Sequence, residues 1–194
     1  MNKPKIWLRL VTLAALLFAS CSAPSTSTRQ VNAPSAPRPT PRYESKSKQT
    51  SRLSTFSGRV VGVDDGDTII VLDADNQTHK IRLQGIDAPE GGQAFGDRSR
   101  ENLSDLVFGK DVTIEWFKRD RYGRIVGKVL VDGRDACLDQ VSAGMAWHYK
   151  YYQSEQTAED RKLYADAETE ARASRLGLWT DANPIPPWDF RRGH

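Results

Sequence analysis

The pattern of apolar and polar positions predicts a β-rich domain that begins near residue 53. From there, short runs of β-branched and aromatic residues alternate with turns rich in Gly, Asp and Asn, as in strands joined by hairpins. Between the first two strands, Gly66 is expected to adopt a positive φ in a tight turn. The expected strands cover residues 56–63, 68–72, 78–86, 112–117 and 125–131.

Apolar residues at helical spacing predict three helices in the same domain. The first covers residues 95–107, where inward positions recur every four residues. A short second helix is expected to begin at Asp135 as its N-cap and to end near Gly144. The third and longest covers residues 154–175, with Gly177 as its C-terminal stop.

This order of elements predicts an α+β, mainly β fold. Five short strands, with one helix between the third and fourth and two helices at the end, would close into a five-stranded OB-fold barrel with three α-helices. The length of 194 residues and the 38% hydrophobic composition suit one such domain with appendages. OB-folds commonly bind nucleic acids on one face.

The first residues predict an exported protein. A basic start, an apolar stretch over residues 10–19 and small residues ahead of Cys21 are typical of a secretory leader over residues 1–20. The string Phe18-Ala19-Ser20-Cys21 resembles the bacterial lipobox, so Cys21 is expected to be acylated and to anchor the protein to a membrane. Because Ser22 is not acidic, the outer membrane or cell surface is favoured. The alternative is ordinary cleavage and release of a soluble enzyme.

The remaining appendages are a linker and a tail. Residues 21–52 are rich in Ser, Thr, Pro and basic residues and carry too little apolar surface to fold, so they predict a disordered tether. The domain proper then covers residues 53–181, and residues 182–194 form a Pro-rich aromatic tail. We expect Trp188 or Phe190 to dock in a groove of the domain, the alternative being a tail that binds a partner.

The charge distribution qualifies a simple nucleic-acid interpretation. The formal net charge is +3, but residues 1–21 contribute +3 and residues 22–52 a net +5, which leaves −5 for residues 53–194. An acidic domain that acts on a polyanion needs a local source of positive charge. The candidates are the basic run Lys118, Arg119, Arg121 and Arg124, or a bound cation that reverses the potential near clustered acids. With Cys21 acylated, Cys137 has no disulfide partner and is expected to be a small buried core residue.

Three separated segments carry the acids and arginines that suggest chemistry: residues 65–68, 82–90 and 120–124. Carboxylates that bind a hard cation, one more that accepts a proton, and two guanidinium groups that bind a phosphate are what phosphodiester hydrolysis with a single divalent metal requires. Each segment alone is weak evidence, because an Asp-Gly-Asp string is more often a turn than a metal site.

These motifs, in this order, resemble the thermonuclease (staphylococcal nuclease-like) family over residues 56–179, here in a secreted lipoprotein form. The resemblance implies a calcium-dependent endonuclease that cuts DNA, RNA or both to 3′-phosphorylated products. It also implies a Ca²⁺ site formed by Asp67, Asp87 and the backbone carbonyl of Ala88, with Asp65 adding negative charge from outside the ligand shell.

The resemblance assigns the reaction to three further side chains. Glu90 would accept a proton from the attacking water, or orient that water, and Arg82 and Arg124 would bind the non-bridging phosphate oxygens. Arg121 and Tyr122 match family positions that contact a phosphate. Stacking of bases is expected on Tyr151 and Tyr152, but the register of the run Trp147-His148-Tyr149-Lys150-Tyr151-Tyr152 is open, and each aromatic could equally be core.

Two other classes of function remain open. One is a non-catalytic nucleic-acid-binding OB-fold module on the cell surface, although such modules tend to lose the acids and arginines that this chain keeps. The other is a structural surface lipoprotein. We expect a monomer. The histidines His79, His148 and His194 lack partners at zinc-ligand or catalytic-triad spacing, so no chemistry is assigned to them.

Overall fold

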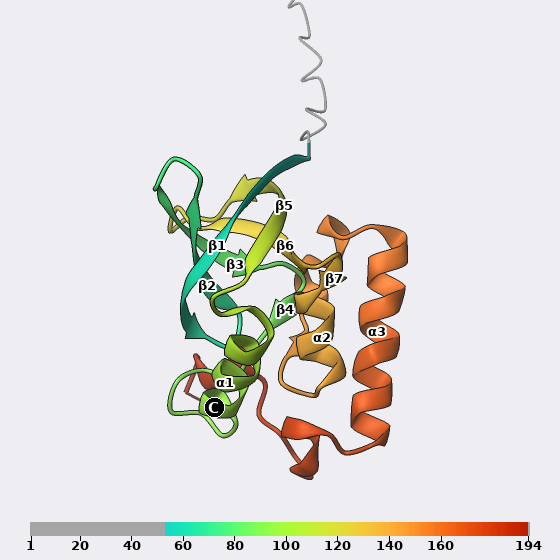
Figure 1. Ribbon diagram of the computed structural model, residues 1–194. Helices are drawn as coiled ribbons and strands as arrows, with labels where there is room; N and C mark the ends of the chain where they lie inside the picture. The colour runs from blue at the N-terminus through green and yellow to red at the C-terminus, as the bar shows by residue number, and fades with distance from the viewer. Residues whose placement is uncertain (1–52, 194) are drawn as a thin grey trace, which may run out of the picture. The chain divides into compact units, whose positions relative to one another are not determined.

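The computed structural model describes residues 53–193, and Figure 1 shows how their elements are arranged. The predicted leader, the predicted lipidation site Cys21 and the predicted linker lie outside the described residues, so all three stay predictions. Among residues 53–193, no helix is both long and apolar enough to cross a membrane.

Five strands form a closed barrel, which confirms the predicted α+β fold. Neighbouring strands follow the order β3-β2-β1-β5-β6, and a parallel pairing between β3 and β6 closes the circle. In that pairing Arg82 lies opposite Val126. The strands are β1 (Ser54–Asp65), β2 (Thr68–Asp73), β3 (Thr78–Leu83), β5 (Asp111–Arg119) and β6 (Ile125–Val131).

Four helices and several short elements complete the domain. In Figure 1, α2 lies between the barrel and α3, which packs beside it, while α1 follows the β4 segment. The two-residue strand β4 pairs with β8, and β7 extends the barrel sheet beyond β6. The helices are α1 (Gly96–Val107), α2 (Ala136–Ser142), α3 (Ala158–Ala173) and α4 (Pro187–Phe190). The short elements are β4 (Ile86–Asp87), β7 (Arg134–Asp135), β8 (Trp147–His148) and the 3₁₀ helices η1 (Lys150–Glu155) and η2 (Gly177–Thr180).

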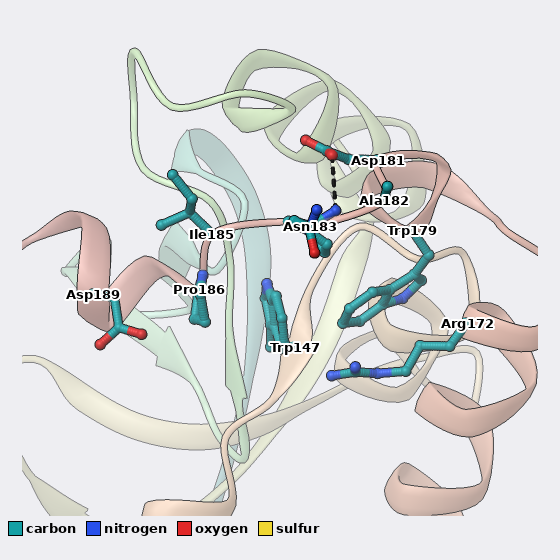
Figure 2. Close-up of a pocket in the computed structure, with 10 residues that line it drawn as sticks. Trp147, Arg172, Trp179, Asp181, Ala182, Asn183, Ile185, Pro186 and Asp189 are labelled. Atoms are coloured by element: carbon teal, nitrogen blue, oxygen red, sulfur yellow. Dashed lines mark hydrogen bonds between the residues drawn. The ribbon is translucent and has the colours of Figure 1, made fainter. Parts of the chain in front are cut away.

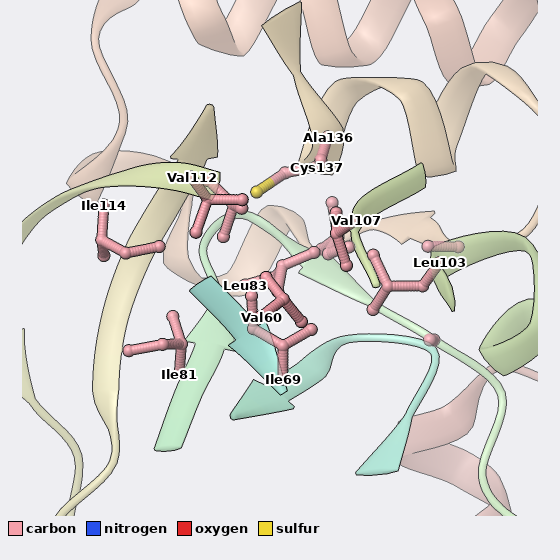
Figure 3. Close-up of a cluster of buried hydrophobic side chains, with 14 of the residues drawn as sticks. Val60, Ile69, Ile81, Leu83, Leu103, Val107, Val112, Ile114, Ala136 and Cys137 are labelled. Carbon is pink, nitrogen blue, oxygen red and sulfur yellow. The ribbon is translucent and has the colours of Figure 1, made fainter. Parts of the chain in front are cut away.

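The barrel interior and the helices share one hydrophobic core (Figure 3). Inward residues of the strands, such as Ile69, Ile81 and Ile114, are fully buried, and Leu103 of α1 closes the core from the side. Cys137 lies in this core with a free thiol, as expected, and burial raises its pKa. Burial of this apolar surface is the main term that stabilises the barrel.

Two predicted elements differ from the expected bounds by more than two residues at one end. The strand expected over residues 78–86 ends at Leu83, because Gly85 turns the chain with a φ of 77° before β4 begins. The helix expected from residue 154 begins instead after Thr157, whose Oγ1 accepts a hydrogen bond from the backbone N–H of Asp160 and so caps the first turn. In contrast, Asp135 caps α2 as predicted.

Candidate active site

Most of the residues singled out by sequence line one cleft of about 700 Å³. It is bounded by the β1–β2 turn, β3, β4, the β5–β6 turn and the segment after β8. The structure thus brings together three motifs that are far apart along the chain. The sequence-predicted residues that line the cleft are Asp65, Asp67, Arg82, Asp87, Glu90, Arg121, Tyr122, Arg124 and Tyr152.

Asp67 is held in the β1–β2 turn by its neighbours. Its backbone N–H donates to Asp65 Oδ1 at 2.9 Å, its Oδ1 accepts from the hydroxyl of Thr68, and its Oδ2 accepts from the backbone N–H of Ala88 at 2.8 Å. Burial raises the pKa of Asp67 to about 7, against the opposing effect of Arg82, and the carboxylates of Asp65 and Asp87 raise it further. A further positive charge beside Asp67 would therefore stabilise the ionised form of this buried carboxylate.

Tight packing, and not a positive φ, fixes the glycine of this turn. Gly66 is absent from the positive-φ glycines of residues 53–193, so the expected conformation was wrong. A Cβ on Gly66 would overlap Ser99 Oγ and lie 2.7 Å from the Ala88 side chain. The buried amide of Gln140 donates to the Gly66 carbonyl at 2.7 Å and to the Ser99 carbonyl at 3.1 Å, a support that no motif in the sequence indicated.

Arg82 joins the two aspartates. Its Nη2 lies 2.9 Å from Asp67 Oδ2 and 2.7 Å from Asp87 Oδ1. Its Nη1 donates to the carbonyls of Leu83 and Ile86, both at 3.0 Å, which fixes the plane of the guanidinium. One cationic nitrogen thus occupies the point at which two buried carboxylates converge.

The β5–β6 turn holds Arg124. Asp120 Oδ1 accepts from the backbone N–H groups of Tyr122 and Arg124, both at 2.9 Å, and Asp120 Oδ2 accepts from Arg124 Nε at 2.7 Å. Partial burial opposes ionisation of Asp120, but the hydrogen bonds from Arg124 outweigh it and lower the pKa. Arg124 lines the cleft, and within residues 53–193 its two terminal nitrogens donate no hydrogen bond, so they are available to bind an anion.

The predicted nucleic-acid contacts lie at different places. Tyr122 is exposed, and the guanidinium groups of Arg121 and Arg124 lie 5.2 Å and 5.6 Å from its ring centre. Tyr152 lines the cleft with Lys118 Nζ 4.9 Å from its ring centre, whereas Tyr151 lines a neighbouring hollow instead.

The other two aromatic candidates have separate environments. Tyr149 lines the cleft and stacks on Trp188 of the tail, with ring centres 5.4 Å apart. Trp147 is buried against Trp179 and Trp188, with Arg172 4.7 Å from its ring centre, and is therefore a core residue (Figure 2). Trp188 docks on the domain as the sequence predicted.

Glu90 and Asp87 share a partner that sequence reasoning missed. Arg191 of the tail donates to Glu90 Oε1 and lies 2.8 Å from Asp87 Oδ2. Asp87 is 1% exposed, and each of its carboxylate oxygens accepts a hydrogen bond from a guanidinium nitrogen, so water has little access to either. The sequence offered no signal for Arg191, because a tail arginine has no fixed spacing to the motifs.

The side chains present fit a hard divalent cation with limited protein ligation. Among residues 53–193, no group of three His, Cys, Asp or Glu side chains could hold a metal, so the protein offers two carboxylates at most. Those of Asp67 and Asp87 converge on one cationic nitrogen, that of Arg82, and Asp65 and Glu90 line the same cleft. Calcium accepts waters and carbonyls to complete a shell of about six to eight oxygens.

The comparisons with known proteins agree with this geometry. The model of the family described as "Staphylococcal nuclease homologue" matches residues 80–181. The chain is 45% identical over 146 residues to a micrococcal nuclease of Shigella flexneri, covering 71% of this chain and 81% of that protein. It is also 45% identical over 135 residues to an uncharacterized endonuclease of Escherichia coli (69% and 84%) and 42% identical over 134 residues to one of Haemophilus influenzae (69% and 72%). The chain is therefore a homologue of micrococcal nuclease and belongs to the staphylococcal nuclease family.

Proposed function

We propose that the protein is a calcium-dependent endonuclease that hydrolyses phosphodiester bonds of DNA, RNA or both and leaves 3′-phosphorylated products. The observation that carries this proposal is the convergence of Asp67, Arg82, Asp87 and Glu90 with Arg124 in one cleft. Relatives named as a nuclease and as endonucleases support it.

The metal would be held by Asp67, Asp87 and the backbone carbonyl of Ala88, with Asp65 outside the ligand shell. Bound there, Ca²⁺ supplies positive charge that stabilises the phosphoryl oxygens as the reaction proceeds. The structure has the N–H of Ala88 donating to Asp67, which fixes this peptide beside the site.

The chain's own groups carry the remaining steps. Glu90 accepts a proton from the attacking water as the water oxygen forms a bond to phosphorus. The bond from phosphorus to the 5′ oxygen then breaks, and the departing oxygen takes a proton from solvent water, which gives a 3′-phosphate and a 5′-hydroxyl. Arg82 and Arg124 donate hydrogen bonds to the non-bridging oxygens, and these strengthen as negative charge develops on them. Arg121 and Tyr122 would bind a neighbouring phosphate, while Tyr151 and Tyr152 would contact bases.

The protein would act outside the cytoplasm as a monomer. We infer export from the leader-like start, and anchoring to the outer membrane or cell surface through an acylated Cys21. Mass spectrometry of the mature N-terminus is expected to find an acylated cysteine. An unmodified terminus at another residue would exclude the anchor and favour a released enzyme.

One assay tests the enzymatic proposal. The purified protein is incubated with single-stranded DNA and with RNA, with calcium or with a chelator, and the ends of the products are determined. We expect cleavage only with calcium, with 3′-phosphate ends. Tight binding without cleavage under every metal tried would favour the alternative, a non-catalytic nucleic-acid-binding module.

A further inference from the structure

The C-terminal tail places a third guanidinium in the cleft. Arg191 lies 101 residues beyond Glu90, and it binds both that carboxylate and Asp87. Its Nη2 lies 2.8 Å and its Nη1 3.3 Å from the two oxygens of Asp87. This arginine therefore contacts the proposed metal ligand and the proposed general base at once, and the inference below rests on that proposed function.

Several contacts hold the tail in this place. Trp188 stacks on Tyr149 at an angle of 19° and packs edge-on against Trp147, with ring centres 5.4 Å apart in each case. The side chain of Gln93 donates to the Ile185 carbonyl at 2.6 Å. Figure 2 shows the segment passing over Trp147, with Pro186 beside the indole. These contacts lie three or more residues before Arg191, so the guanidinium could leave the cleft without releasing the tail.

A metal ion and Arg191 need the same oxygens. Asp87 Oδ1 already accepts from Arg82 at 2.7 Å, so Oδ2, which Arg191 contacts, is the oxygen of Asp87 with the fewest partners. A divalent cation bound to Asp87 would also repel the adjacent guanidinium, because little water screens charges beside a carboxylate that is 1% exposed. Arg191 itself is 43% exposed, so its displaced form can be solvated at low cost.

We propose that Arg191 is a tethered counter-ion of the metal site, which holds Asp87 and Glu90 in the calcium-free protein and must be displaced when calcium binds. It thereby sets the calcium affinity of the enzyme. In this role it acts through Asp87 and Glu90, as a positioning residue, and not on the substrate.

Calorimetric titration of the full chain with calcium, without nucleic acid, tests this role. Arg191→Ala is expected to bind calcium about three- to tenfold more tightly than the wild type, because the metal no longer displaces a partly exposed ion pair. Arg191→Lys keeps the charge but has one donor group in place of the fork, so an intermediate affinity is expected. The matched control is Arg192→Ala, which removes the same charge from the next residue, whose nearest carboxylate lies 3.9 Å away. It should change the affinity by less than about twofold.

The outcomes separate this role from general electrostatics and from the proposed function. Equal gains in Arg191→Ala and Arg192→Ala would show a field effect and would overturn the inference, as would an unchanged or weaker affinity in Arg191→Ala. Thermal melts establish whether each variant is folded. If Arg191→Ala does not fold, the calcium affinity of Arg191→Lys still tests the inference. If calcium bound to neither the wild type nor Arg191→Ala, the calcium assignment itself would fail, and this inference with it.

Discussion

Arg82 makes four polar contacts, and no other side chain type can reproduce them. Two carbonyls fix its Nη1, and two buried carboxylates share its Nη2. With the side chain only 15% exposed, solvent competes little for these bonds. These contacts use the four N–H groups of Nη1 and Nη2, so the planar guanidinium keeps its Nε–H for a phosphate oxygen, whereas an ammonium has no fork.

We expect Arg82→Lys to lower kcat/KM on single-stranded DNA by a factor of about 10² to 10³, comparable to the loss of one preorganised donor to a developing oxyanion. The fold should persist, because the core residues of β3 are unchanged. The control is Arg59→Lys, which alters an exposed arginine on β1. Activity of Arg82→Lys within a factor of two of the wild type would remove Arg82 from the reaction.

Asp67 offers a second test at this scale. Asp67→Asn keeps the size of the side chain and removes the charge, so calcium affinity should fall by at least about tenfold as the ligand charge decreases. Calorimetry measures this directly. Asp64→Asn is the matched control, because Asp64 belongs to the same turn but pairs with Lys80 at 2.7 Å outside the cleft. Unchanged binding in Asp67→Asn would show that Asp67 is not a ligand.

The β1–β2 turn is an element whose shape depends on long-range packing. Gly66→Ala would drive a methyl group into Ser99 and Ala88, and overpacking of this kind costs about 1–3 kcal/mol. Because the same turn carries Asp65 and Asp67, weaker calcium binding should accompany the loss of stability. Urea denaturation and calorimetry would measure the two effects. A variant with wild-type stability would mean that the turn can shift without cost.

The β4–β8 pair is expected to be sensitive to acid. His148 is buried, its Nε2 bonds Gln156 Oε1, and burial with the nearby Lys150 lowers its pKa, against the raising effects of Gln156 and Glu168. The folded state thus binds a proton less readily than the unfolded state. The contribution of neutral His148 to the free energy of unfolding is fully present above about pH 6.5. It is lost as the pH falls from there toward the lowered pKa of the folded state.

His148→Gln removes this titration. The difference in unfolding free energy between wild type and variant should therefore change as the pH falls below about 6.5, with the wild type losing more stability on acidification. Titrating groups that do not interact with His148 cancel in this comparison. Urea denaturation at several pH values measures it, and parallel curves for the two proteins would contradict the assignment.

Local sequence predicted these elements better than it predicted how they meet. The motif residues were identifiable because each segment is short and its chemistry lies in residue type and spacing. Asp135 as a helix cap is likewise a local property. The parallel closure of β3 on β6, the Gln140 support and the arrival of Arg191 depend on contacts between distant segments, which no periodicity records. Gly66 illustrates the limit. The turn pattern predicted a glycine for its positive φ, whereas the structure needs a glycine because Ser99 and Ala88 leave no space for a Cβ.

At the scale of the whole molecule, the acidic balance of residues 53–194 requires that strand binding be local. We propose that the β5–β6 turn is the local binding site, because Arg121 and Arg124 flank the exposed ring of Tyr122 at the edge of the cleft. Arg124 is paired with Asp120, but Arg121 forms no ion pair within residues 53–193 and can neutralise a phosphate at full charge. Affinity for a strand should therefore depend on a few contacts and have a shallow salt dependence.

We expect Arg121→Ala to weaken binding of single-stranded DNA to a similar degree for all sequences and to reduce the slope of log affinity against log salt by about 0.7, the value for one phosphate contact on a single strand. Fluorescence anisotropy with calcium measures this in an Arg82→Ala background, where cleavage is expected to be slow compared with the measurement. Arg59→Ala, which removes an exposed arginine that does not line the cleft, should leave the slope unchanged. Equal changes in both variants would mean that the net charge of the domain, and not the β5–β6 turn, governs its encounter with nucleic acid.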